Sequence, residues 1–378
     1  MTATTHLAIL GRQPELGLLE LESLLGADNI TLFGKKASLF SGDVSINRLG
    51  GVIKIGDVLY SGPTIDVLEA PIDWLGLGRG ERKTTFGLSF YGPSVNPRLV
   101  LATGLELKKR LRQAGPVRLV SPTTGTDLTA AQLHHNNVLG EGFELMVMVS
   151  GSQMVVARTT AVQDIDAYAA RDHARPARSA KVGMLPPKLA QVLLNTTSAP
   201  VIIDPFCGTG VVLQEALLTD RSAYGSDLAP EMEAATRTNL EWLATQTSTP
   251  LPAWQVNTAD ARKATLPTSE AAVVSEGYLG TNLTAMPGST QLAELEAEIT
   301  ALYRASLLNW ARQLPSGAEI ALCLPNWRVQ GGWKTPSVVD DLYKIGYTTK
   351  VFKHVPGPVR YARPDQIVGR QFLLLTRL

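Results

Sequence analysis

The sequence contains few of the features that would place the protein in a membrane or outside the cytoplasm. Only two cysteines, Cys207 and Cys323, occur in 378 residues, each at the end of an expected apolar strand of one sheet. They form neither a disulfide framework nor a zinc spacing and are typical of reduced thiols in a cytoplasmic protein. The amino terminus, MTATTHLAIL, has no basic region, and no uncharged stretch approaches the roughly 20 residues of a membrane span. We therefore expect a soluble, unexported protein.

The sequence also lacks a large excess of either charge. Lys and Arg number 35 and Asp and Glu 34, which gives a formal net charge of +1. A global attraction to nucleic acid is thereby excluded, so any RNA affinity must come from local patches. At 378 residues the chain exceeds one ordinary hydrophobic core, and its apolar content of 44% is ample for burial, which predicts two or three domains.

The most informative stretch present is VIIDPFCGTGVVLQEALL, residues 201–218. Its first three residues are branched and apolar, as in a parallel strand buried on both faces, and Asp204 ends that strand. Gly208 and Gly210 permit a tight turn and let a ligand lie against main-chain amides. Apolar residues at helical spacing follow. The unit is typical of a nucleotide-like ligand site at the carboxyl edge of a parallel sheet, although a purely structural turn stays open.

Two further acids end the next apolar stretches. Asp227 lies 17 residues after Gly210, near the offset of about 20 expected of a ribose-binding carboxylate, and Asp260 follows an expected strand at 254–258. Three acids at successive strand ends fit a ligand with a ribose, a base and an amine-bearing tail. NAD is disfavoured, since no GxGxxG occurs and Asp204 would repel a pyrophosphate. S-adenosylmethionine has no phosphate and is the expected cofactor.

Periodicity predicts further elements along the chain. In the front half we expect a single strand over 30–40, a strand over 84–92 and a helix from Pro97 to about Ala114 with Leu101, Leu105 and Leu111 inward. In the rear half we expect three helices at 229–244, 290–313 and 338–347, the first packing through Met232, Ala235 and Leu240.

Two segments carry a resemblance to a known family. DPFCGTG at 204–210 and RDHARPARSAKVGMLPPKLAQ at 171–191 resemble the amino-methyltransferases that carry an RNA-binding THUMP domain, the tRNA guanosine-10 N2-methyltransferases and their relatives. LGGVIKIGDVL, FGLSFYG and YARPDQIVGR extend the similarity along the chain. The resemblance implies a class I Rossmann-like methyltransferase domain with a mixed seven-stranded sheet at 189–378. An α+β region precedes it, with a ferredoxin-like module at 1–60, a THUMP-like domain at 61–165 and a basic linker at 166–188.

The resemblance assigns S-adenosylmethionine binding to the glycine loop, the strand-end acids and the segment before the loop. These residues are Asp204, Pro205, Phe206, Cys207, Gly208, Thr209, Gly210, Asp227, Leu228, Asp260 and Ala261, with Met184, Leu185 and Pro186 covering the cofactor. No metal is expected, since the adjacent His134 and His135 would point in different directions from a helix. The expected partner is tRNA, bound by a monomer.

Two basic stretches are candidate contacts for tRNA phosphates. They comprise Lys108, Lys109, Arg110 and Arg112 on the outer face of the helix that starts at Pro97, and Arg171, Arg175, Arg178 and Lys181 in the linker. A charged helix face is often merely solvated, and that alternative stays open for the first stretch. The second directly precedes the cofactor loop and contains three prolines that fix its path, which favours a phosphate contact.

The loop after the fourth strand of the rear half carries the candidate catalytic residues. Methylating an exocyclic amine requires mainly geometry and oxygens that hold the amino hydrogens, with the base flipped onto an aromatic ring. The family has DPPY or NPPY here, whereas this chain has SEGYLG at 275–280. Either Ser275 stands in the acid's place or Glu276 is the acceptor in a shorter loop. We hypothesise that Glu276 accepts from the amine and Tyr278 stacks the base; alternatively, Tyr278 packs and Glu276 faces water.

Two functions follow from these observations. The favoured one is S-adenosylmethionine-dependent methylation of a guanine amino group in tRNA, with the front half holding the RNA. The competing one is a noncatalytic RNA-binding protein that kept the cofactor pocket but lost the usual acceptor. A DNA amino-methyltransferase is disfavoured by the THUMP-like front half.

Overall fold

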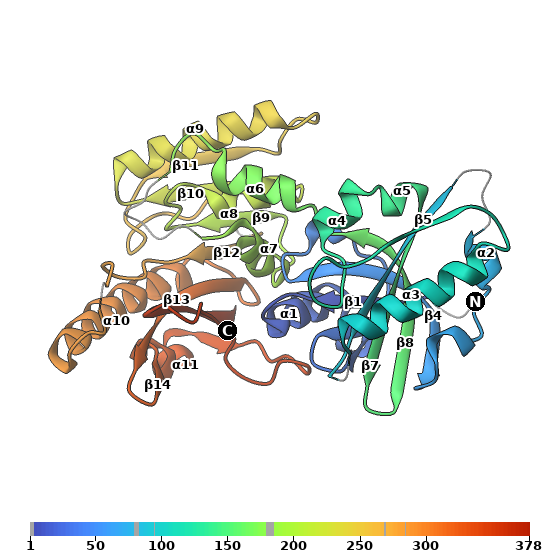
Figure 1. Ribbon diagram of the computed structural model, residues 1–378. Helices are drawn as coiled ribbons and strands as arrows, with labels where there is room; N and C mark the ends of the chain where they lie inside the picture. Colours follow the sequence, from blue (N-terminus) through green and yellow to red (C-terminus); the bar gives the residue numbers. More distant parts are fainter. Residues whose placement is uncertain (1–3, 79–82, 94, 179–184, 268–269, 284) are drawn as a thin grey trace. The chain divides into compact units, whose positions relative to one another are not determined.

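A computed structural model describes residues 4–78, 83–93, 95–178, 185–267, 270–283 and 285–378. It divides the chain into two compact units, Met1–Asp166 and Ala167–Leu378 (Figure 1). Among the described residues, no helix combines the length and apolar composition that crossing a membrane requires.

The first unit is built on one eight-stranded sheet in the order β2-β3-β1-β4-β8-β7-β5-β6. Within it β5 pairs in parallel with β6 and β7, and the other pairs are antiparallel. The strands are β1 (Thr5–Leu10), β2 (Ile30–Phe33), β3 (Ala37–Ser41), β4 (Val52–Pro63), β5 (Thr84–Tyr91), β6 (Val117–Val120), β7 (Gly142–Ser150) and β8 (Gln153–Val162). The helices are α1 (Pro14–Leu25), α2 (Trp74–Gly78), α3 (Pro97–Leu111), α4 (Ala130–His135) and α5 (Val138–Glu141).

The structure of this unit differs from two expectations. The single strand expected over 30–40 is wrong, because a turn at 34–36 folds it into the antiparallel pair β2 and β3. The boundary expected at residue 60 falls inside β4, which pairs with β1 in its first half and with β8 along its length. The α+β class is as expected, and a separate THUMP-like domain stays a prediction.

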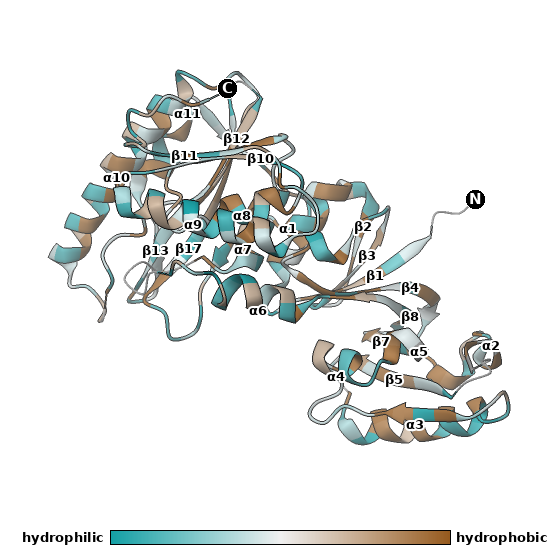
Figure 2. Cartoon of the chain, turned by 90° about the horizontal axis from the view of Figure 1, so that it is seen from above, coloured by the Kyte–Doolittle hydropathy of each residue, from teal (hydrophilic) through white to brown (hydrophobic). Residues whose placement is uncertain are grey.

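The helix expected from Pro97 is present as α3, but its inward face differs from the expected one. Asn96 caps it by accepting from the amide of Leu99, and it ends at Leu111. Its buried residues are Val100, Gly104, Leu107 and Leu111. Leu101 and Leu105 are 47% and 48% exposed, so their inward placement is wrong. Helical spacing fits both sets, and the row beginning one residue earlier packs against the sheet, in one core cluster with Phe86 and Phe143. Figure 2 shows α3 lying along the strands of this unit.

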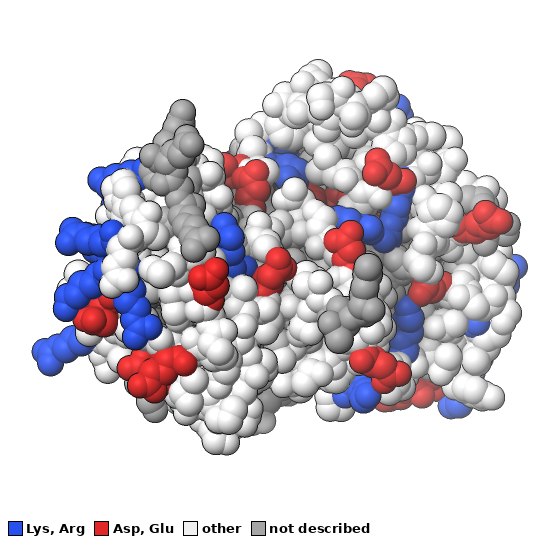
Figure 3. Space-filling view, turned by 90° about the vertical axis from the view of Figure 1, so that its right-hand side faces the viewer, with Lys and Arg blue, Asp and Glu red and all other residues white. Residues whose placement is uncertain are grey.

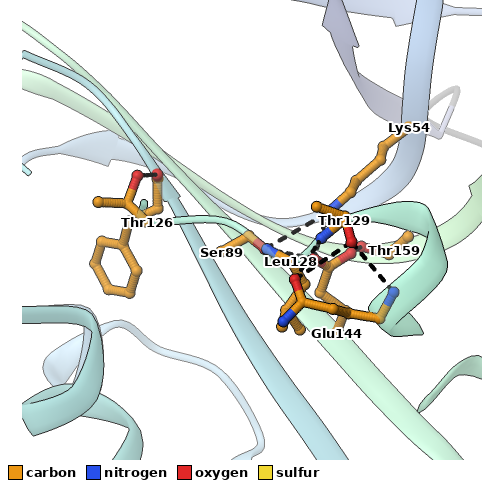
Figure 4. Close-up of polar contacts among 9 residues, drawn as sticks. Lys54, Ser89, Thr126, Leu128, Thr129, Glu144 and Thr159 are labelled. Atoms are coloured by element: carbon orange, nitrogen blue, oxygen red, sulfur yellow. Dashed lines mark hydrogen bonds and ion pairs between the residues drawn. The ribbon is translucent and has the colours of Figure 1, made fainter. Parts of the chain in front are cut away.

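A buried ion pair joins the central strands of the first unit (Figure 4). Lys54 of β4 lies 2.5 Å from the carboxylate of Glu144 in β7, and both side chains are at most 2% exposed. The same carboxylate accepts from Ser89 of β5 and Thr159 of β8. Ser89 in turn accepts from the amide of Leu128. The four strands are thus linked by one polar network inside the sheet.

The second unit contains the expected mixed seven-stranded path in the order β11-β10-β9-β12-β13-β17-β15, with short β14 and β16 added at β13 and β17. The strands from β11 to β13 in this order are parallel, and β17 is antiparallel to both neighbours. The strands are β9 (Val201–Asp204), β10 (Ser222–Asp227), β11 (Trp254–Thr258), β12 (Ala271–Glu276), β13 (Glu319–Val329), β14 (Gly332–Lys334), β15 (Tyr347–Thr349), β16 (Arg360–Tyr361) and β17 (Val368–Arg377).

The helices of this region are α6 (Ile165–His173), α7 (Pro187–Asn195), α8 (Val211–Leu217), α9 (Pro230–Gln246), α10 (Ser289–Ala311) and α11 (Leu342–Ile345). Tyr303 and Trp310 of α10 are fully buried in an apolar core cluster against this sheet. The helix expected over 338–347 is wrong in kind, since a 3₁₀ segment (Ser337–Asp341) precedes the single turn of α11. The segment expected as a linker at 166–188 is largely helical at its start, in α6.

Candidate functional site

The strand-end acids of the second unit meet at one edge of its sheet. The parallel registers pair Asp204 with Gly225 and Ile203 with Val273, so the carboxyl ends of β9, β10 and β12 lie side by side. Asp204 and Asp227 are the last residues of their strands. The structure therefore brings together two of the three predicted acids, Asp204 and Asp227, at this edge.

The two glycines of the loop between β9 and α8 have different surroundings. Both adopt left-handed backbone conformations, with φ of 51° at Gly208 and 83° at Gly210. A Cβ on Gly210 would lie 2.7 Å from Cγ2 of Thr236, whereas a Cβ on Gly208 would meet nothing within 4 Å. Gly210 is therefore needed for packing, and the backbone at Gly208 faces open space that a ligand can occupy.

Helix α9 holds this loop through polar side chains that the sequence analysis did not single out. Thr236 donates to the carbonyl of Gly208 at 2.7 Å, and Asn239 donates to the carbonyl of Thr209 at 2.8 Å. Both are fully buried, as is the expected Leu240, while the expected Met232 and Ala235 are only half-buried. Polar residues three positions apart, in line with the apolar face of the helix, are the sequence signal that could have identified them.

Asp227 fastens the loop from the neighbouring strand. One carboxylate oxygen accepts from the amide of Gly208 at 3.0 Å, and the other accepts from the amide of Ala229 at 3.0 Å. The next side chain, Leu228, is 67% exposed. A carboxyl group beside an exposed leucine offers a polar and an apolar contact to a nucleoside.

Asp260 and Ala261 occupy the third strand end. Arg262 donates to both oxygens of Asp260 and lowers the pKa of that carboxyl. The carbonyl of Ala261 accepts from the indole of Trp310 at 3.2 Å, which ties the turn to α10. The third acid is therefore ionised and half-exposed, but already has a cationic partner.

Asp204 is buried beneath the loop. Ser275 of β12 donates to it at 2.5 Å and the amide of Phe206 at 3.1 Å. Burial raises the pKa of Asp204 to about 7, opposed by these two hydrogen bonds. Ser275 is fully buried, so it supports Asp204 and does not face a substrate.

The buried carboxyl of Asp204 gives a pH-dependent stability with a defined sign. Its pKa of about 7 in the folded protein exceeds the ordinary 3.8. The free energy of unfolding is therefore highest below about pH 4, where the carboxyl is protonated in both states, and falls as the pH rises to 7. Asp204→Asn should become more stable than the wild type over that range, by up to about 4 kcal/mol at pH 7. Urea denaturation at several pH values measures the difference.

Asp260→Asn is the matched control, because its lowered pKa predicts the opposite sign. That variant should lose stability relative to the wild type above about pH 4. Stability curves of wild type and Asp204→Asn that stay parallel from pH 4 to 7 would contradict the assignment.

The acceptor loop after β12 is held by an ion pair. Arg370 of β17 donates through Nε to the carboxylate of Glu276, and both side chains are mostly buried. Burial raises the pKa of Glu276, and Arg370 opposes that rise. Glu276 therefore does not face water. Its ion-pair partner, Arg370, lies 94 residues later in the chain, and no sequence pattern assigned it a role.

The rest of the loop is fixed by α10. The hydroxyl of Tyr303 donates to the carbonyl of Tyr278 at 3.0 Å. A Cβ on Gly277 would lie 2.0 Å from that hydroxyl, so only glycine fits there. Tyr278 as a whole is 39% exposed, which leaves a surface for stacking. Tyr303 thus supplies the rigidity that the absent prolines do not.

The basic linker residues are placed differently from one another. Arg171 pairs with the buried Glu215 of α8 at 2.7 Å and covers the ring of Tyr168, and Arg175 is 2% exposed. Arg175 is too buried to reach a phosphate, and the guanidinium of the half-buried Arg171 is already paired with Glu215, so neither assignment is supported. Arg178 is exposed, and Leu185 is buried before Pro186, which caps α7. Lys181 and Met184 lie outside the described residues.

The basic residues of α3 also differ in their exposure and in the contacts they already make. Arg110 donates to the carbonyl of Leu68 at 2.5 Å, and Lys109 pairs with Glu106 on the exposed surface. Lys108 is half-buried and Arg112 exposed. Figure 3 shows Lys and Arg gathered on one side of the face drawn, with Asp and Glu among them.

Among the described residues, no group of three His, Cys, Asp or Glu could hold a metal.

The chain is similar in sequence to curated tRNA (guanine(10)-N2)-dimethyltransferases. It is 27% identical to that of Methanothermobacter thermautotrophicus over 202 residues, which are 53% of this chain and 54% of that protein. It is 42% identical to that of Pyrococcus abyssi over 59 residues, 15% of this chain and 18% of that protein. The matched regions thus span about half of the first relative and less of the second. No family model matches the sequence.

Solved structures share the fold along the chain. TrmN from Thermus thermophilus has a TM-score of 0.55 at 16% identity and covers 99% of this chain and 100% of its own. SMU.472, described as a methyltransferase and complexed with SAH, has a TM-score of 0.50 at 12% identity and covers 99% and 98%. Together with the strand order, this confirms the expected class I Rossmann-like methyltransferase fold.

Proposed function

We propose that the protein is an S-adenosylmethionine-dependent methyltransferase that acts on the exocyclic 2-amino group of a guanosine in tRNA. The observation that carries the proposal is the glycine loop, whose backbone at Gly208 faces open space beside the carboxylate of Asp227. The similarity to the curated tRNA (guanine(10)-N2)-dimethyltransferases supports the substrate. A cytoplasmic location fits the two reduced, buried cysteines.

The residues at the sheet edge fit the proposed cofactor. The main chain at Gly208 would approach it closely, Asp227 would accept from ribose hydroxyls, and the open Leu228 would cover a base. Asp204 would lie beneath the amine-bearing tail, with Ser275 positioning its carboxyl. When bound, the cofactor supplies an electrophilic methyl group. The protein's task is then to orient the amine and exclude water.

The acceptor loop would orient the target base. Glu276, held in place by Arg370, would accept from the amino group and stabilise the charge developing on its nitrogen. Tyr278 exposes a ring on which a flipped base can stack. The same ion pair favours the second candidate, a noncatalytic RNA-binding protein, because a carboxylate already bound to arginine is a weaker acceptor.

Calorimetry and methyl transfer to tRNA separate these functions. The wild type should bind S-adenosylmethionine and transfer a labelled methyl group to bulk tRNA. Nucleoside mass spectrometry would then identify the base. Asp227→Ala removes two charge-assisted hydrogen bonds that shape the loop, and should weaken cofactor binding about ten- to hundredfold.

Asp340→Ala, which removes an exposed acid of the 3₁₀ segment, is the matched control and should bind the cofactor normally. Cofactor binding without transfer to any tRNA would support the noncatalytic alternative. No uptake of the cofactor would refute the enzymatic proposal.

A further inference from the structure

Two arginines converge on one tryptophan beyond the carboxyl edge of the second sheet. The Cζ atom of Arg328 in β13 lies 5.0 Å from the ring centroid of Trp333 in β14, and that of Arg360 in β16 lies 4.7 Å from it. Both distances are within cation–π range. We call these three residues the arginine–tryptophan cluster. They have no role in the site described above.

The ring at the centre of the cluster is held firmly. Trp333 is the cross-strand partner of the first arginine, and its Cζ3 atom lies 3.2 Å from where a Cβ of Gly369 would be. On the neighbouring strands, Asn326 donates to Thr335 at 2.7 Å and Thr335 donates to Gln371 at 2.7 Å. The register and these contacts place all of them on one face of the sheet.

The cluster lies beyond the same carboxyl edge of the sheet as the acceptor loop, but on the opposite face, because residues of a strand alternate between faces and Arg328 stands an odd number of residues after the partner of Glu276. Strands β12 and β13 are parallel, and Glu276 is paired with Cys323. Arg328 follows five residues later on the continuous strand β13, which is about 16 Å further along. A short run of single-stranded nucleotides can span this separation from the loop.

The chemistry of the cluster fits the sugar-phosphate backbone of RNA. A guanidinium stacked on an aromatic ring keeps its donors in a fixed plane, suited to bidentate contact with a phosphate. Arg360 is exposed and donates to Asn326 at 3.5 Å, and no salt bridge among the described residues involves Arg328. Lys109 of α3, unlike Arg328, already has an acidic neighbour. Aromatic and arginine planes together are typical of single-strand RNA surfaces.

We propose that the arginine–tryptophan cluster binds phosphates of the tRNA strand next to the nucleotide presented to the acceptor loop. The inference rests on the proposed function. It adds a contact surface in the second unit to the basic residues expected in the first.

Charge-removing variants test the cluster. Arg328→Gln and Arg360→Gln should each weaken tRNA binding on the order of fivefold at moderate salt, and each should reduce the slope of log affinity against log salt by about 1. Trp333→Leu should weaken binding with little change in slope, because it removes the support of the arginines and no charge. Affinity for S-adenosylmethionine, measured by calorimetry, should stay at the wild-type value.

Lys344→Gln is the matched control. It removes one charge from α11, which leads into β15 at the opposite end of β17. Its tRNA affinity and salt slope should match the wild type. If it weakens binding as much as Arg328→Gln does, the effect is general electrostatics and the proposal is overturned.

The outcomes separate the two proposals. Wild-type methyl transfer together with unchanged tRNA binding in the cluster variants would overturn the cluster and leave the enzyme. Weakened tRNA binding in those variants, in a protein that takes up no S-adenosylmethionine, would support the cluster and overturn the enzymatic proposal. Binding of an acidic peptide at the cluster, with no response of tRNA binding to the substitutions, would also overturn the assignment to RNA.

Discussion

Replacing Glu144 by Ala is expected to destabilise the first unit by about 3–5 kcal/mol, enough to unfold it locally. The change leaves the ammonium group of Lys54 buried without its carboxylate and removes the acceptor for Ser89 and Thr159. Hydrogen exchange of the full-length protein measures the effect, since amides of β4, β7 and β8 should lose protection while those of the second unit keep it.

A compensating pair distinguishes an unpaired charge from lost packing. Glu144→Leu combined with Lys54→Met replaces both ions by apolar side chains of similar volume, and should recover most of the lost stability. Glu106→Ala breaks an exposed pair with Lys109 and should change stability by at most about 0.5 kcal/mol. A double variant as unstable as Glu144→Ala would show that the charge is not the cause.

Ion pairs between residues far apart in the chain, such as Lys54 and Glu144, could not be predicted from the sequence. Strand, glycine loop and helix at 201–218 follow from local patterns, and the parallel order of the strands then brings Asp204 and Asp227 to one edge. Lys54 and Glu144 are 90 residues apart, and periodicity reports only neighbours on one element. The same limit explains α3, where two rows of apolar residues fit the helical period and only the sheet selects between them.

Residue roles were harder to predict than residue positions. The composition of the linker predicts exposed charges, but Arg171 is only half-exposed, because it pairs with Glu215 of α8, 44 residues later. Ser275 stands where the family has an acid, and the structure shows it donating to Asp204. Gly277 looks permissive in sequence, yet Tyr303 occupies the space its side chain would need. Each role depends on a partner that no local pattern specifies.

Replacing Arg370 by Met should lower the rate of methyl transfer about 100- to 1,000-fold. Burial already raises the pKa of Glu276, and removing the arginine leaves that rise unopposed. A larger fraction of the carboxyl would then be protonated, and the protonated form cannot stabilise positive charge on the amine. Since ionisation returns above the raised pKa, the transfer rate of the variant should increase with pH more steeply than that of the wild type. Single-turnover transfer across pH measures this.

Two further variants separate positioning from stability. Arg370→Lys keeps the charge but not the donor geometry, and should retain the wild-type pH profile at a reduced rate. Arg370→Met combined with Glu276→Gln leaves no buried charge, so it should fold stably yet transfer as slowly as Arg370→Met. Calorimetry should show wild-type S-adenosylmethionine affinity in all three, because the pair does not touch the glycine loop. A wild-type rate and pH profile in Arg370→Met would mean that Glu276 is not the acceptor, and the noncatalytic alternative would gain.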